Sequence, residues 1–224
     1  MYEKLFNMNK QNDMRAFFLQ ELAPLGKIID FKKNDEIYTM SNHNIIIVMS
    51  GTVKVFTFTP TGHEKVLFYL ISGEILGESS YFVDDHIDVK ALSVEDVTVS
   101  YLEDSKLDKF LIQYPNAYRF FIHSLTRKYR IALSQINDFL AESPKTRIAS
   151  TLYRLAVLTP KTSNNKYSIN LTMTHQELAN LIGCSRITVT RIINELKNEN
   201  IIDMKNKEIY ILNMEALKKL SQLT

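Results

Sequence analysis

The sequence from Arg186 to Asn194, RITVTRIIN, holds the side chains whose types and spacing suggest chemistry most clearly. At about 100° per residue in a helix, one face carries Arg186, Ile187, Thr190, Arg191 and Asn194. Arginine can donate two hydrogen bonds to guanine, and an aliphatic side chain can contact the methyl group of thymine. The opposite face carries an apolar stripe of Val189, Ile192, Ile193 and Leu196. We therefore predict a helix that packs by its apolar face and reads DNA base edges with the other. The predicted base-contacting residues are Arg186, Ile187, Thr190 and Arg191.

The residues before this helix predict a shorter helix and a tight turn. Thr174, followed three residues later by Glu177, forms a capping box that starts the shorter helix. Gly183 lies in the turn, and Ser185 is a favourable N-cap for the helix that follows. This arrangement is typical of a helix-turn-helix whose second helix enters the major groove of DNA. The alternative is an ordinary helical hairpin with a solvated outer face, where lysine or glutamate would be expected in place of Ile187.

Length and composition limit the class of protein. The 224 residues allow one large domain or two smaller ones, and 45% apolar with 23% charged residues is an ordinary globular composition. No apolar run reaches the ~18 residues of a membrane span, and the N-terminus lacks the apolar core of a signal peptide. The single cysteine, Cys184, excludes an intrachain disulfide and a Cys-x-x-Cys metal site. We therefore expect a cytoplasmic protein that does not contact a membrane.

Charge is distributed unevenly along the chain. Residues 1–144 contain 15 basic and 19 acidic residues, whereas residues 145–224 contain 12 basic and 6 acidic residues. A basic C-terminal part behind an acidic body is typical of a separate domain that binds a polyanion. Together with the predicted helix-turn-helix, this asymmetry favours double-stranded DNA as the partner.

Residues 25–104 favour short strands over helices. Apolar and β-branched runs recur at residues 45–48, 53–56, 66–70 and 97–101. Turn residues separate these runs, and Gly62 within the sequence PTGHE suits the tip of a hairpin. This spacing predicts an antiparallel barrel or sandwich.

Helical periodicity returns after residue 104 and continues from Pro115 to about residue 142. Apolar residues there follow a 4-3-4-3-4-3 spacing, which is an a/d seam over three heptads. The seam residues are Tyr118, Ile122, Leu125, Tyr129, Ala132, Ile136 and Phe139. The seam indicates a coiled coil between two copies of the chain, because DNA-binding proteins of two-fold symmetry need a dimer. The alternative is a helix that packs on its own barrel.

The remaining sequence predicts the rest of a winged helix. Ser143-Pro144 marks a hinge, since the residue before proline disfavours the helical region, and Ser143 can cap a helix at about residues 145–158. Two short strand patterns around a Lys205-Asn206-Lys207 turn predict the wing, and a closing helix runs from about residue 214 to 223. Polar side chains placed for contact with DNA phosphates are Gln176, Ser185, Thr188, Lys205 and Lys207.

The strands, the long helix, the hinge and the winged helix together resemble the CRP/FNR family of bacterial regulators over essentially the whole chain. The most specific stretch is residues 177–191 with GCSRITVTR inside it, and Gly51, Ser72-Gly73-Glu74 and Gly77-Glu78 resemble the turn glycines and pocket motif of the family's β-roll. The resemblance implies an α+β fold with an N-terminal antiparallel β-roll of the cyclic-nucleotide-binding type. It also implies a long dimerisation helix and a C-terminal winged helix-turn-helix. The corresponding parts are a sensor domain at 1–112, the dimerisation helix at 113–142 and the DNA-binding domain at 143–224.

The recognition helix departs from the family at one position. Family members typically present an arginine, a glutamate and a later arginine to base edges; Arg186 and Arg191 match the arginines, and Ile187 stands where the glutamate usually is. Glutamate accepts a hydrogen bond from the cytosine amino group, which isoleucine cannot do. We therefore expect an A·T pair to be preferred there, within a palindromic, A·T-rich site.

The pocket departs more strongly. Members that bind cyclic nucleotides hold the phosphate with an Arg-Ser/Thr pair after the Gly-Glu motif, whereas residues 82–91 here read FVDDHIDVKA. Three aspartates would repel an anionic phosphate instead of clamping it, so cyclic AMP is not expected. A single cysteine cannot hold an iron–sulfur cluster. Haem remains open because His43, His63 and His86 lie in the roll, although scattered histidines are more often solvated.

The runs at residues 53–55, 62–65 and 196–202 resemble the branch of the family that senses small organic molecules, including halogenated-phenol regulators. That resemblance implies a small organic effector and no permanent cofactor. The candidate pocket residues are Glu78, Ser79, Tyr81, Lys90, Lys128 and Tyr129. Lys90 or Lys128 could bind a phenol-like or carboxylate ligand, and the alternative is that both lysines are solvated.

Two further alternatives remain. The chain could be a constitutive regulator that binds DNA without a ligand, and an activator of this kind would also contact RNA polymerase. A cupin-like metalloenzyme would need a His-x-His pair with a further His or Glu, but no two histidines have that spacing and no nucleophile–base pair is visible. We therefore expect no catalytic residues and no metal site. Cys184 is expected to be inert core, with a redox role as the alternative.

Overall fold

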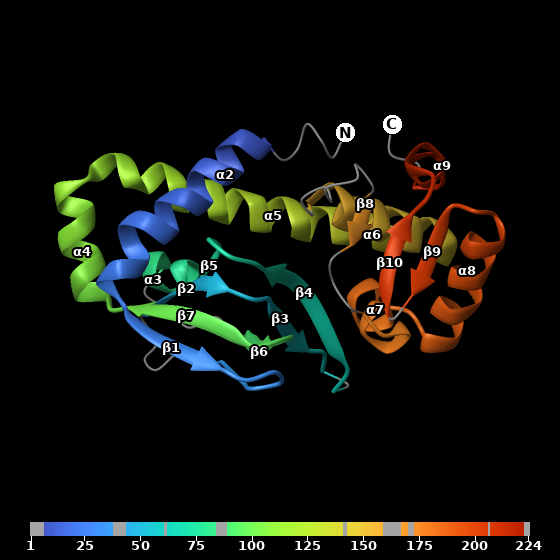
Figure 1. Ribbon diagram of the computed structural model, residues 1–224, viewed down its shortest axis with the longest axis horizontal. Helices are drawn as coiled ribbons and strands as arrows, with labels where there is room; N and C mark the ends of the chain where they lie inside the picture. The colour runs from blue at the N-terminus through green and yellow to red at the C-terminus, as the bar shows by residue number, and fades with distance from the viewer. Residues whose placement is uncertain are drawn as a thin grey trace. The chain divides into compact units, whose positions relative to one another are not determined.

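The computed structural model describes residues 7–37, 44–60, 62–83, 89–140, 143–158, 167–169, 173–205 and 207–221, with backbone alone at residues 138–140, 158, 167 and 168. The chain divides into two compact units, Asn7–Ile131 and Ala132–Thr224. The division falls inside the longest helix, α5 (Tyr118–Leu140), which Figure 1 draws in yellow-green. None of the described helices combines the length and the hydropathy that crossing a membrane requires.

The first unit contains two antiparallel sheets, with strand orders β1-β7-β2-β5 and β4-β3-β6. Their strands are β1 (Lys27–Phe31), β2 (Ile45–Ser50), β3 (Val53–Phe58), β4 (Glu64–Leu70), β5 (Ile75–Leu76), β6 (Lys90–Ser93) and β7 (Val97–Leu102). Strands β3 and β4 form a hairpin that pairs Phe58 with Glu64 and Val53 with Leu70. Gly62 has a φ of 79° in its turn, as the sequence predicts.

Strand β2 is buried on both faces, which explains its unbroken apolar sequence. Successive side chains of a strand point to opposite faces. Ile46 and Val48 pack with Val53 and Val55 of the other sheet. Ile45 and Ile47 instead belong to a second core, which lies between their sheet and a layer of helices. The unit is therefore built from three layers, and Figure 1 shows the helices on one side of the sheet that contains β2.

The helical layer of the first unit comes from both ends of the strand region. Its elements are α2 (Met8–Phe17), the π-helical turn η1 (Phe18–Leu22), the 3-10 turn η2 (Ala23–Leu25), α3 (Glu78–Val83), α4 (Asp104–Gln113), the 3-10 turn η3 (Pro115–Ala117) and the first part of α5. Phe18 from η1 and Phe121 from α5 are fully buried and meet edge to face at 5.1 Å between ring centroids. This packing fixes the start of α5 against the roll.

Helix α2 lies close to the turn that precedes β5. A Cβ placed on Gly73 would lie 2.5 Å from the Cβ of Arg15, and Gly73 has a φ of 79°. Only glycine accommodates both the left-handed backbone and so close a neighbour. The Ser72-Gly73 turn therefore serves to bring α2 against the sheet.

The second unit is a winged helix. Its elements are the last part of α5, α6 (Pro144–Leu158), β8 (Tyr167–Ile169), α7 (His175–Ile182), α8 (Arg186–Asn198), β9 (Ile202–Lys205), β10 (Glu208–Ile211) and α9 (Met214–Leu220). Strands β9 and β10 form the predicted wing, with Lys205 opposite Glu208 and Ile202 opposite Ile211. The Ser143 hydroxyl accepts a hydrogen bond from the Thr146 N–H at 3.1 Å, which is the predicted cap of α6.

The predicted α+β fold class is confirmed, and three local differences have physical causes. Strand β8 was not predicted, because it has three residues, too few to show a period; it pairs with β10. Helix α3 follows the Gly77 turn directly and has only six residues. Pro115 begins a 3-10 turn instead of the long helix, which starts at Tyr118. The predicted end of that helix, at residues 141–142, lies outside the described residues.

Candidate nucleic-acid interface

Local hydrogen bonds set the turn between α7 and α8. The Thr174 N–H donates to Glu177 Oε2 at 2.7 Å, and the Glu177 N–H donates to Thr174 Oγ1 at 3.1 Å. Gly183 ends α7 in the left-handed conformation, with its N–H donating to the Ala179 carbonyl. Ser185 Oγ then accepts from the Thr188 N–H at 3.1 Å and starts α8. The predicted capping box, turn and N-cap are all confirmed.

Helix α8 separates its apolar and polar side chains onto opposite faces. Val189, Ile192, Ile193 and Leu196 are buried in the second unit. The other face is exposed, and 82% of the Ile187 surface is accessible. An open groove on this face is lined by Arg186, Ile187, Thr190 and Arg191, which we name the recognition groove. The structure therefore brings the four predicted base-contacting residues together, while the contacts themselves stay a prediction.

The two arginines of the recognition groove differ in their surroundings. Arg191 forms an ion pair with Glu195 one turn further along α8, and both side chains are accessible to solvent. Glu195 also lies 3.9 Å from Lys145 Nζ, which in turn bonds Glu199 at 2.6 Å. Exposed pairs of this kind contribute little to stability. Arg191 can therefore leave Glu195 for a stronger acceptor at low cost.

Thr190 makes a contact that sequence reasoning missed. Its hydroxyl donates to the Arg186 carbonyl at 2.9 Å and lies 2.8 Å from Nδ1 of His175, the first residue of α7. Partial burial lowers the pKa of His175 below its ordinary value, and the positive charges of Arg186 and Lys197 lower it further. His175 is therefore neutral at pH 7. The capping box identifies His175 as the first residue of α7, but no local signal in the sequence indicates its contact with Thr190, 15 positions away.

The predicted phosphate-contacting residues lie on α7, at the start of α8 and on the wing. The Gln176 side chain donates to Asn180 at 2.9 Å, and the hydroxyls of Ser185 and Thr188 lie 2.8 Å apart at the start of α8. Lys205 and Lys207 are exposed on the wing, where Lys205 Nζ lies 3.4 Å from Asp203. Asn206, between the two lysines, lies outside the described residues. Their roles stay predictions.

Helix α5 has two different faces. Phe121, Ser124, Arg127 and Ile131 are buried. The seam positions point elsewhere: Ile122 is 61% exposed and Tyr129 63% exposed, Tyr118, Ala132 and Ile136 are also exposed, and Leu125 is half-buried. The Phe139 side chain lies outside the described residues. Five of the six described seam side chains are therefore exposed in the single chain.

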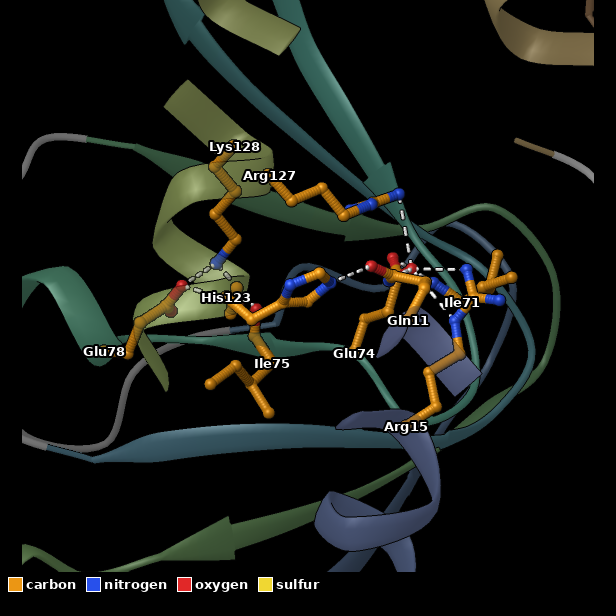
Figure 2. Close-up of polar contacts among 10 residues, drawn as sticks. Gln11, Arg15, Ile71, Glu74, Ile75, Glu78, His123, Arg127 and Lys128 are labelled. Carbon is orange, nitrogen blue, oxygen red and sulfur yellow. Dashed lines mark hydrogen bonds and ion pairs between the residues drawn. The ribbon is translucent and has the colours of Figure 1, made fainter. Parts of the chain in front are cut away.

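A buried polar network joins α2, the turn before β5 and the inner face of α5 (Figure 2). Glu74 Oε1 accepts from Arg15 Nη2 at 2.6 Å and from Gln11 Nε2 at 3.0 Å, and it lies 3.2 Å from Arg127 Nη2. The Gln11 carbonyl oxygen lies 3.0 Å from His123 Nε2. Sequence reasoning missed this network because each of these contacts joins residues more than 50 positions apart.

A second polar cluster surrounds Glu78 of α3, which is fully buried. Lys128 from α5 forms an ion pair with Glu78 Oε1 and donates to the Ile75 carbonyl at 2.8 Å (Figure 2). The Ser124 hydroxyl donates to the same carboxylate oxygen at 3.1 Å. Among the described residues, nothing donates a hydrogen bond to Glu78 Oε2. Lys128 is thus held by a carboxylate and is not a solvated lysine.

The other predicted pocket residues are dispersed. Tyr81 donates to Asp108 on α4, and burial together with this hydrogen bond raises the pKa of its phenol well above the ordinary value. Lys90 Nζ lies 3.6 Å from Glu36 and 5.9 Å from the centre of the Phe58 ring. Tyr129 lies on the exposed seam, and Ser79 is half-buried beside Glu78. The structure therefore brings Glu78 and Lys128 into contact but does not gather all six residues around one cavity.

Few of the histidines considered for haem can be placed. His63 is exposed in the β3–β4 turn, and His43, His86 and the aspartates at 84, 85 and 88 lie outside the described residues. Within the part of the chain that the structure describes, no three His, Cys, Asp or Glu side chains are arranged to hold a metal ion. Cys184, the single cysteine, is half-buried in the turn between α7 and α8.

Comparisons with known protein families match the N-terminal roll and the C-terminal winged helix separately. Residues 28–114 match the cyclic nucleotide-binding domain, and residues 146–220 match the Crp-like helix-turn-helix domain. The chain is 30% identical over 167 residues to the cAMP-activated global transcriptional regulator CRP of Haemophilus influenzae, covering 73% of each protein.

Solved structures share the fold. A CooA mutant from Carboxydothermus hydrogenoformans superimposes with a TM-score of 0.76 at 21% identity, covering 93% of this chain and 95% of that one. CprK in complex with OCPA superimposes with a TM-score of 0.69 at 22% identity, covering 91% and 93%. With its two matching domains and its similarity to CRP, the chain belongs to the CRP/FNR family of DNA-binding transcription regulators and is not an enzyme.

Proposed function

We propose that the chain acts as a homodimer that binds a palindromic, A·T-rich site, with α8 of each protomer in a major groove. The recognition groove carries this proposal, because exposed Arg186, Ile187 and Arg191 stand on a helix whose other face is buried. Two-fold readers of this kind place their recognition helices in successive major grooves, about 34 Å apart. Gln176, Ser185, Thr188, Lys205 and Lys207 would contact phosphates and fix the register.

The exposed seam of α5 supports the homodimer. Ile122 and Ile136 each expose more than half of their surface, and they lie 14 residues apart at equivalent heptad positions. Helices with apolar a and d positions bury such a stripe against a second copy. In the proposed organisation, residues 1–112 sense, residues 113–142 dimerise and residues 143–224 bind DNA, in the cytoplasm.

The cluster around Glu78 supports control by a small organic molecule. A buried carboxylate oxygen without a hydrogen-bond donor is costly, and Glu78 Oε2 is such an atom among the described residues. A neutral ligand with a hydroxyl or amide donor would satisfy it, whereas an anionic ligand would have to take Lys128 from Glu78. CprK, which shares this fold, was solved in complex with OCPA, and this supports a ligand-binding role for the fold.

A constitutive regulator is the second candidate, and the Lys128–Glu78 pair favours it. Lys128 already neutralises the only carboxylate that it reaches in the described cluster, so the roll and α5 are joined without a ligand. In the effector-controlled case, a ligand shifts the equilibrium only through its different affinity for two states of the dimer. That shift would pass along α5 to α6 through Ser143-Pro144. An activator would further need a surface for RNA polymerase.

Selection of bound duplexes from a random library by the purified protein tests the proposal. A strong palindrome without added ligand supports a constitutive or already active dimer. Binding that is sensitive to salt but blind to sequence indicates a missing effector, and the same selection then becomes the assay for candidate ligands. A selected site with G·C at the Ile187 position, or with no two-fold symmetry, contradicts the proposal.

A further inference from the structure

The Thr190 hydroxyl forms its hydrogen bonds within the protein. A hydroxyl has one hydrogen and two lone pairs, and the Thr190 hydrogen is donated to the Arg186 carbonyl at 2.9 Å. His175 Nδ1, 2.8 Å from the same oxygen, must therefore be the donor in their contact. This places the His175 proton on Nδ1. It also leaves the Thr190 hydroxyl with no hydrogen to donate to a DNA base.

The surface of the recognition groove agrees with this assignment. Two arginines and a threonine contribute to the groove, yet its accessible lining is almost entirely apolar. Because the oxygen of Thr190 faces His175 and the Arg186 carbonyl, the methyl group is the part of the side chain left to line the groove. Residues three apart on a helix are surface neighbours. Ile187 and Thr190 therefore form one apolar strip between Arg186 and Arg191.

We propose that His175 is a positioning residue for base recognition, which holds the Thr190 hydroxyl away from DNA so that Thr190 reads thymine through its methyl group. The inference rests on the proposed placement of α8 in the major groove. Thr190 would then contact thymine at a second base pair, next to the one that Ile187 contacts. A free hydroxyl at Thr190 would accept from the amino group of adenine or cytosine and would blur that preference.

The alternative role for His175 is purely structural, as a link between α7 and α8. The two roles differ in what the variants do to individual bases. A structural link lost in His175→Ala would weaken binding equally at every base pair. Loss of positioning would relax the preference at one base pair in each half-site and leave the others unchanged.

The test measures the affinity of the full-length protein for its selected palindrome and for every single-base substitution of one half-site. Thr190→Val removes the hydroxyl and keeps the methyl, so it should retain the thymine preference. Thr190→Ser keeps the hydroxyl and removes the methyl, which should reduce that preference about fourfold, the value of one buried methyl group. His175→Ala should broaden the preference at the same base pair. His175→Asn, which can still donate, should restore it.

The double variant His175→Ala/Thr190→Val separates positioning from structure. With no hydroxyl left to release, it should recover the thymine preference that His175→Ala loses. The inference is overturned if Thr190→Val changes the preference and Thr190→Ser does not, or if His175→Ala weakens all base pairs equally. Ile187→Glu, measured on the same duplexes, reports on the proposed function itself. If Ile187→Glu changes the base preference at its own base pair and the His175 and Thr190 variants change no preference, only the role of His175 is contradicted. If Ile187→Glu also changes no preference, the proposed placement of α8 in the major groove is contradicted as well.

Discussion

Arg15 Nη2 and Glu74 Oε1 lie 2.6 Å apart, with side chains only 12% and 2% exposed, and this pair fixes the N-terminal helix to the turn before β5. Arg127 on α5 approaches the same carboxylate oxygen at 3.2 Å. One carboxylate therefore joins two helices to the roll. A buried charge that loses its partner is strongly destabilising, so the stability of the first unit should depend on Glu74.

Replacing Glu74 by glutamine should destabilise the first unit strongly. The change leaves Arg15 and Arg127 buried without a carboxylate, and breaking a buried pair in this way costs about 3–5 kcal/mol. Urea unfolding followed by circular dichroism measures the loss. Asp96→Asn is the matched control, because its pair with Lys32 is exposed to solvent and should matter little. Equal effects of the two substitutions would show that the buried network does not hold α2.

Gly73→Ala should lower stability more than Gly62→Ala. Both glycines have a φ of 79°, so both substitutions carry the same left-handed strain of about 1–2 kcal/mol. A Cβ at Gly73 would also lie 2.5 Å from the Cβ of Arg15, whereas a Cβ at Gly62 meets nothing within 4 Å. The difference between the two melting temperatures therefore reports the close approach of α2. No difference would mean that α2 can move away without cost.

Stability should fall as the pH is lowered through the range where unfolded histidine becomes protonated. Burial lowers the pKa of His123 below its ordinary value, and the positive charges of Arg127, Lys10 and Arg130 lower it further. The folded state therefore binds fewer protons than the unfolded state, and the contribution of neutral His123 is lost as the pH falls from about 6.5 towards its folded-state pKa. Thermal unfolding between pH 7.5 and 5.5 measures the slope. His123→Gln, which can still donate to Gln11, should reduce the slope; an unchanged slope would assign the pH dependence to other groups.

Ile122→Glu should convert the proposed dimer to a monomer without unfolding it. The side chain is 61% exposed in the single chain, so a charge there costs the protomer little, but in a two-fold seam it would bring two carboxylates together in an apolar interface. Sedimentation velocity measures the change in mass. Asn137→Glu adds the same charge at another exposed position of α5, off the seam, and should leave the mass unchanged. A wild-type protein that sediments as a monomer would contradict the seam assignment directly.

The parts of the fold that sequence reasoning predicted correctly depend on local signals. The capping box at Thr174, the cap at Ser185 and the exposed Ile187 follow from residues within four positions of each other, and the structure has all three. The strands of the roll were visible because β-branched runs alternate with turn residues. In each of these cases, the residues that determine the local structure are neighbours in the sequence.

The parts that were missed depend on contacts between distant residues. Arg15 and Glu74 are 59 positions apart, and nothing near Arg15 in the sequence indicates a buried partner. Tyr81 is a candidate pocket residue, and sequence reasoning gave no sign that its hydroxyl donates to Asp108 on α4. Lys90 and Tyr129 also lie away from Glu78. Lys90 on β6 pairs with Glu36, and Tyr129 lies on the exposed seam of α5.

The substitution Ile187→Glu tests the central claim that α8 reads DNA with an aliphatic side chain where relatives commonly use an acid. Binding selections with wild type and variant, from the same random duplex library, compare the base pair opposite position 187. Asn198→Glu, which adds the same charge at the far end of α8, controls for repulsion by DNA. Glutamate should shift the selected base pair from A·T to G·C by about tenfold, the value of one good base contact. Identical half-sites for wild type and variant would contradict the account, because Ile187 would then not face the bases.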